Sequence, residues 1–88
     1  MDFIAPFVGQ TVIVDLDDAY LVIGTLVSAD AHHLAFADAD LHDHREANST
    51  KEVYALESHR IGVRVNRTRV TVPRHRLVAI SLLADTCV

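Results

Sequence analysis

The stretch Gly9–Ala39, GQTVIVDLDDAYLVIGTLVSADAHHLAFADA, decides the fold of this chain. In the segment 12–16, apolar residues occupy every second position, which is the period of a strand with one face in a core. Residues 17–19 interrupt the run, and the β-rich segment that follows contains Gly24. A glycine inside a strand indicates a sharp bend or a close backbone approach. The stretch therefore predicts three successive strands, at residues 10–17, 20–29 and 32–38.

The rest of the chain predicts a polar loop and then one helix. Residues 39–47, ADLHDHREA, are polar and charged, which is typical of a loop. Ser49 and Glu52 have the spacing of a capping box with Ser49 as the N-cap. Apolar residues then recur at helical spacing, and Gly62 is a natural stop. We therefore expect a helix at residues 50–61.

Two further strands are predicted after the helix. Val63 and Val65 alternate with arginines, residues 66–68 predict a turn, and the strand pattern resumes at residues 70–72. A last strand at residues 77–83 is apolar on both faces, which favours a central position in the sheet. The fold class is therefore mainly β. We expect a small five-stranded, strongly bent, SH3-like barrel with a short helix in an insert at about residues 40–66.

Size and composition limit the class of protein. The chain has 88 residues, half of them hydrophobic, so residues 1–88 form one domain. A barrel this small leaves sheet edges open, which favours self-association. No run approaches the ~18 apolar residues of a membrane helix, and no basic-then-apolar leader is present, so we expect a cytoplasmic protein without a membrane. Cys87 is the only cysteine and cannot form an internal disulfide.

Charge is distributed unevenly along the chain. Residues 1–44 carry eight aspartates and no Lys or Arg, whereas residues 45–88 carry eight basic against four acidic residues. Arg64, Arg67 and Arg69 form a candidate basic face. Three interpretations stay open: this face tracks phosphates, it pairs with the aspartates at 15, 17 and 18 of a neighbouring copy, or it is ordinary solvated charge.

Two groups of residues resemble the motifs of the Sm-like family of small ring-forming barrels. The first group is Gly9, Val12, Val14, Leu16, Gly24, Leu26, Asp30, His33, Leu34, Phe36 and the Asp38-Ala39 ending. The second group is Val70, Val72, Leu77 and Ile80. The resemblance implies a homo-oligomeric ring, formed by pairing residues 70–72 of one copy with residues 77–83 of the next. It also implies binding of single-stranded RNA.

The resemblance assigns the RNA site to three residues. His32 lies near the position of the family's base-stacking residue, His33 replaces an Asn, and Arg74 is the cationic wall, displaced by one residue from the family's Arg-Gly turn. The alternative for His32 and His33 is that they are ordinary turn residues. The alternative for the whole chain is an oligomeric scaffold or protein-interaction module that has lost RNA binding.

Neither catalysis nor a cofactor is expected. The serines lack a nucleophile-elbow context, and the three glycines form no phosphate-binding loop. His42 and His44, two residues apart in an acidic loop, have the donor types of a Zn²⁺ or Mn²⁺ site, but no second set completes it. We therefore predict no metal, and we interpret this segment as a solvated loop or a subunit contact.

Overall fold

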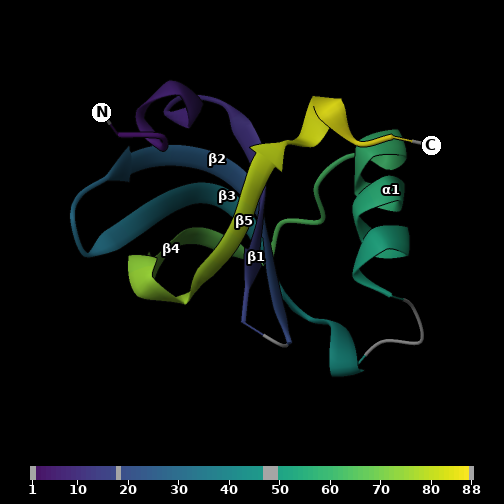
Figure 1. Ribbon diagram of the computed structural model, residues 1–88. Coiled ribbons are helices and arrows are strands. Elements are labelled where there is room, and N and C mark those ends of the chain that lie inside the picture. Colours follow the sequence, from purple (N-terminus) through teal and green to yellow (C-terminus); the bar gives the residue numbers. More distant parts are fainter. Residues whose placement is uncertain (1, 18, 47–49, 88) are drawn as a thin grey trace.

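The computed structural model describes residues 2–17, 19–46 and 50–87, and its five β-strands form one bent antiparallel sheet (Figure 1). The strand order is β4-β3-β2-β1-β5, so β4 and β5 are the two edges. The strands are β1 (Thr11–Leu16), β2 (Tyr20–Ala29), β3 (His33–Asp43), β4 (Arg67–Pro73) and β5 (Leu77–Leu82). The helix α1 (Lys51–Ile61) lies between β3 and β4, and short 3₁₀ turns are η1 (Ala5–Phe7), η2 (His44–Glu46), η3 (Arg74–Arg76) and η4 (Leu83–Asp85).

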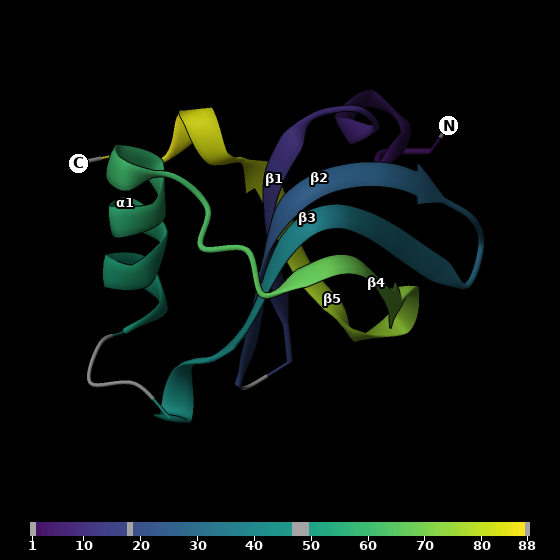
Figure 2. The ribbon, with the colours of Figure 1, turned by 180° about the vertical axis from the view of Figure 1, so that it is seen from behind.

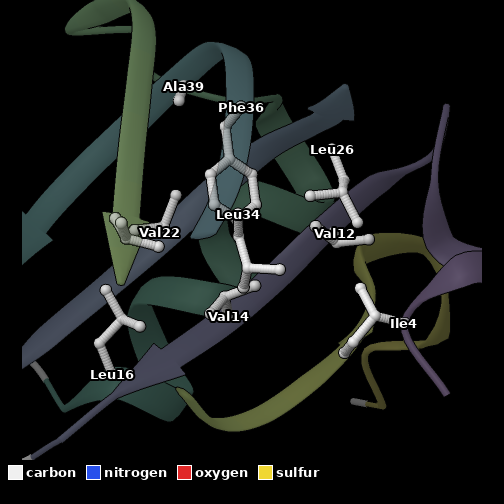
Figure 3. Packing of buried hydrophobic residues seen from close by; sticks show 10 residues of the cluster. Ile4, Val12, Val14, Leu16, Val22, Leu26, Leu34, Phe36 and Ala39 are labelled. Atoms are coloured by element: carbon white, nitrogen blue, oxygen red, sulfur yellow. The ribbon is translucent and has the colours of Figure 1, made fainter. Parts of the chain in front are cut away.

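The concave face of the sheet encloses the main core (Figure 3). Alternate residues of β1, β2 and β3 point inward, and Ile4 from the N-terminal segment closes one end. Phe36 and Leu34 are fully buried at its centre. This confirms the alternation that the opening stretch predicts, because the inward positions of β1 are Val12, Val14 and Leu16.

Gly24 lies where two strands approach most closely. A Cβ atom at this position would lie 2.9 Å from both the Cα and the Cβ of Ala39 on β3. The neighbouring Asp38 has a positive φ of 49°, and the pairing of β2 with β3 shifts register at this point. The glycine therefore marks a close backbone approach beside an irregularity in β3, which tightens the bend of the sheet.

We expect Gly24→Ala to destabilise the fold by about 1–3 kcal/mol, because backbone atoms of β3 must move to admit the methyl group. Ser28→Ala, at an exposed position of the same strand, should change stability by less than about 0.5 kcal/mol. Urea unfolding of both variants measures the difference. Equal midpoints for the two variants would contradict the tight approach.

A second, smaller core lies on the opposite face of the sheet, under α1. Ile13, Leu21 and Ile23 point outward from β1 and β2 and pack with Tyr54 and Ala55 of the helix. Figures 1 and 2 show α1 to one side of the sheet, connected to β4 by an extended segment. Both faces of the central strands are therefore covered, which explains why their sequences are almost continuously apolar.

The start of α1 is capped by Thr50. Its hydroxyl accepts a hydrogen bond from the Val53 backbone N–H at 3.2 Å. Gly62, with a φ of +98°, ends the helix, as expected. The predicted N-cap, Ser49, lies outside the described residues.

Most of the predicted fold is confirmed, including the mainly β class, the strongly bent five-stranded sheet and the helix in the insert. Two strand boundaries were predicted wrongly. β3 continues to Asp43 through a segment expected to be a loop, and β4 begins at Arg67 within the expected turn. Residues 63 and 65 lie in neither a helix nor a strand.

The position of β5 was also predicted wrongly, since it is an edge strand. Its second apolar side is exposed at Val78, and its inward side is only half-buried. Among the described residues, no helix is long and apolar enough to cross a membrane.

Candidate functional site

The turn between β2 and β3 is organised by Asp30. One of its carboxylate oxygens accepts hydrogen bonds from the backbone N–H groups of His32 and His33, each at 2.7 Å. These bonds, that from His32 first, hold the pKa of Asp30 below its usual value. The sequence Asp-Ala-His-His forms this turn because an aspartate side chain readily replaces a backbone acceptor two or three residues away.

Arg74 joins this turn to the N-terminus. Its guanidinium donates to the Asp30 carbonyl at 2.8 Å and to Asp2 at 2.6 and 3.3 Å, while its backbone N–H donates to the His32 carbonyl at 2.8 Å. The hydrogen bond from Arg74 is the main cause that lowers the pKa of Asp2, and the same bond raises the pKa of Arg74.

The structure therefore brings together the three residues assigned to an RNA site. Their only guanidinium, that of Arg74, already has a carboxylate partner. His32 and His33 are exposed, with ring centroids 6.4 Å apart and planes at 72°. The charge of Arg74 is compensated by Asp2, 72 residues away in sequence. No local sequence signal identifies such a distant partner, so sequence reasoning missed it. The corner is a structural tie between the N-terminus and the β2–β3 turn.

We expect Arg74→Ala to loosen the N-terminal segment, because Asp2 loses its guanidinium partner. Hydrogen exchange should speed up at the amides of Phe7 and Gly9, whereas Arg60→Ala on the exposed face of α1 should leave them unchanged. Unaltered exchange in Arg74→Ala would show that the tie does not hold this segment.

The predicted basic face is divided in two. Arg64 donates to Glu57 at 2.7 Å and lies over the ring of Tyr54, with its Cζ 4.7 Å from the centroid. Arg67 and Arg69 are exposed on β4, and neither has a carboxylate partner among residues 2–17, 19–46 and 50–87.

The aspartates expected to pair with these arginines across a subunit contact have partners in the same chain. Asp15 pairs with Lys51 of α1 at 3.2 Å, and Asp17 pairs with Arg76 of η3. Asp18 lies outside the described residues. Within the described chain, Arg67 and Arg69 are therefore left available on the β4 edge.

A buried polar network connects β3, α1 and the start of β4. Asp40, which is 1% exposed, accepts hydrogen bonds from the Tyr54 hydroxyl and from Asn66 Nδ2, the latter at 3.0 Å. Asn66 Oδ1 also accepts from the Leu41 backbone N–H at 2.9 Å, and the Asn66 backbone N–H donates to the Ala39 carbonyl at 2.9 Å. Because a buried carboxylate needs partners, this network fixes the insert on the sheet.

His42 belongs to the same region. Its ring stacks on Tyr54 with centroids 3.7 Å apart and planes at 8°. In the segment considered for a metal site, His42 therefore lies on β3 with its imidazole against an aromatic ring, whereas His44 begins η2. Sequence reasoning missed Asp40, Tyr54 and Asn66, although a lone tyrosine in the helical insert was a usable signal.

Tyr54 makes the network sensitive to alkaline pH. Burial first, and then the hydrogen bond to Asp40, raise the pKa of Tyr54 from 10.0 to about 12. Between these values the hydroxyl ionises only in the unfolded chain, so the free energy of unfolding should fall as pH rises through this window. Urea unfolding from pH 9 upward should show a shallower fall for Tyr54→Phe than for Tyr20→Phe. Parallel profiles would contradict the burial of this hydroxyl.

The two sheet edges are open, since β4 and β5 are not hydrogen-bonded to each other within the described chain. The inward residues of β5, Leu77, Ile80 and Leu82, pack against the core but are only half-buried. Val78 on the same strand is 67% exposed. Open edges and incompletely covered apolar residues are the features of a surface that another chain covers.

A groove of about 540 Å³ lies between the end of α1 and the end of β5. Its lining is Gln10, Thr11, Ser58, His59, Gly62, Val63, Leu82, Leu83 and Ala84. This lining contains no lysine or arginine, and His59 is the one titratable side chain in it.

The comparisons with known proteins give one informative likeness. Neither a protein-family model nor a curated protein matches this chain. Among solved structures, the chain is similar to a chain in the crystal structure of the NatC complex bound to CoA, with a TM-score of 0.58 and 25% sequence identity. The likeness covers 93% of this chain and 88% of that chain.

This finding corrects the predicted family and function. The solved chain belongs to the NatC complex, and the comparison supports neither the Sm-like assignment nor a homo-oligomeric RNA-binding ring. It does not favour the oligomeric-scaffold alternative either. One physical reason lies at the predicted RNA site, where the charge of Arg74 is compensated by Asp2 of the same chain.

Proposed function

We propose that this chain is a non-catalytic subunit of a hetero-oligomeric protein complex and binds a different polypeptide through an open edge of its sheet. The observation that carries the proposal is the likeness to a chain of the NatC complex, which extends over 93% of this chain and 88% of that one. A likeness over nearly the whole of both chains supports a common role as a subunit of a complex. The candidate partners are proteins that resemble the other chains of the NatC complex.

The exposed edges support a protein partner. An 88-residue chain alone buries a smaller fraction of its surface than a larger domain does, and here the half-buried side of β5 leaves Ile80 and Leu82 incompletely covered. A partner that packs on this side would remove apolar area from water, at roughly 25 cal/mol per Å². Binding to another protein would therefore complete the core.

Charge favours a different polypeptide over a second copy. The β4 edge carries Arg67 and Arg69, whereas the β5 strand, LVAISL, contains no carboxylate. Pairing β4 of one copy with β5 of another would leave both arginines without acidic partners at that contact. A heterologous partner can supply the missing charge.

A non-catalytic role fits the chemistry of the described surface. The NatC complex structure contains CoA, whose phosphate groups are commonly bound by lysine or arginine, and the groove beside α1 has neither in its lining. In the proposed assembly, a partner would bind such a ligand. We keep a cytoplasmic location as part of the proposal, to be tested by fractionation.

Isolation of the native assembly tests the proposal. The tagged full chain, expressed at its natural level in its own cells, should co-purify with at least one different polypeptide in fixed stoichiometry, as measured by native mass spectrometry. Recovery of the chain alone, or only with copies of itself, would overturn the proposal.

A further inference from the structure

We propose that β4 is the docking strand, and that its ligand is an extended acidic segment of the protein partner. The segment would add to the sheet beside β4 and place carboxylates opposite Arg67 and Arg69. This inference rests on the proposed function, because it needs a protein partner. It names the edge that binds and the chemistry of the segment.

The backbone of β4 is available for strand addition. β4 pairs with β3 along its length, from His33↔Pro73 to Ala39↔Arg67, and has no other strand beside it in the described chain. In an antiparallel ladder, alternate residues direct their N–H and C=O groups away from the paired strand. These groups can form a new ladder with an extended segment. Pro73, which lacks an N–H, limits this ladder to the residues before it.

The side chains of β4 select an acidic segment. Val72 is buried and Val70 packs against the core, so alternation places Arg67, Arg69 and Thr71 on the opposite, exposed side. The two arginines lie two positions apart, so their Cα atoms are roughly 7 Å apart along the strand. Alternate residues of a bound strand have the same spacing. Arg67 donates one N–H to the Asn66 carbonyl at 3.0 Å and keeps further donors free.

The network around Asp40 holds this edge in place. Asn66, the residue before β4, is fixed by hydrogen bonds to Ala39, Leu41 and Asp40. A docking strand anchored by the residue that precedes it loses little conformational freedom on binding. The arginines therefore project from a rigid element.

A peptide fits this edge better than RNA. RNA would also neutralise arginines, but a phosphodiester chain cannot match the alternating donors and acceptors of a strand edge. At the predicted RNA site, Arg74, which donates to the turn that holds His32 and His33, is already paired with Asp2.

Two peptides of about ten residues test the inference on the full chain. One has glutamate at every second position with threonine and valine between, and its twin has lysine in place of glutamate. We expect the acidic peptide to bind at low salt, by calorimetry, and to slow amide exchange at Thr68–Val72. Arg69→Glu should weaken binding about tenfold, whereas Arg60→Glu, an equal change of charge on the exposed face of α1, should have little effect.

The outcomes separate this inference from the proposed function. If the native chain co-purifies with a different polypeptide and Arg69→Glu reduces recovery more than Arg60→Glu, both stand. If the complex forms but the two variants reduce recovery equally, the β4 inference is wrong and the proposed function stands. The same conclusion follows if the acidic peptide fails to bind, or if it binds no better than its lysine twin. Binding of oligouridine RNA in place of the acidic peptide, or of a second copy along β4, would also overturn the inference.

Discussion

The buried carboxylate of Asp40 is the interaction on which the rest of the structure depends. It is almost inaccessible to water and is satisfied by Tyr54 from α1 and Asn66 from the start of β4. A carboxylate without these partners would be costly to bury, so helix, strand and connecting segment must assemble together. This requirement extends β3 into a polar segment and sets where β4 begins.

Given that arrangement, the sheet has one neutral and one basic edge. β5 displays half-buried apolar residues, and β4 displays Arg67 and Arg69 without carboxylate partners in the described chain. Several other charges are paired inside the molecule: Asp15 with Lys51, Asp17 with Arg76 and Asp2 with Arg74. The β4 edge therefore combines an unpaired backbone with two arginines that lack a carboxylate partner in the described chain.

The sequence was sufficient for the fold class but not for the site. Periodicity predicts the first three strands because it acts between neighbours in sequence. Gly24 is a second local signal, because the close approach of Ala39 leaves no room for a side chain there. The extension of β3 could not be predicted, since its polar residues 40–43 pair with β2 and the buried Asp40 has its hydrogen-bond partners, Tyr54 and Asn66, far away in sequence. The pairing of Arg74 could not be predicted for the same reason, because Asp2 reaches it from the far end of the chain. Apolar motifs supported a barrel and carried no information about its partner.

The most direct test of this account is photo-crosslinking from β4 in the native complex. A photoreactive residue in place of Thr71, exposed on β4, should give an adduct with an acidic segment of a different polypeptide. The same residue in place of Ser81, exposed on β5, should give no adduct with that segment. An adduct between position 71 and a second copy of this chain would contradict the account. An adduct of that segment with position 81 and none with position 71 would also contradict it.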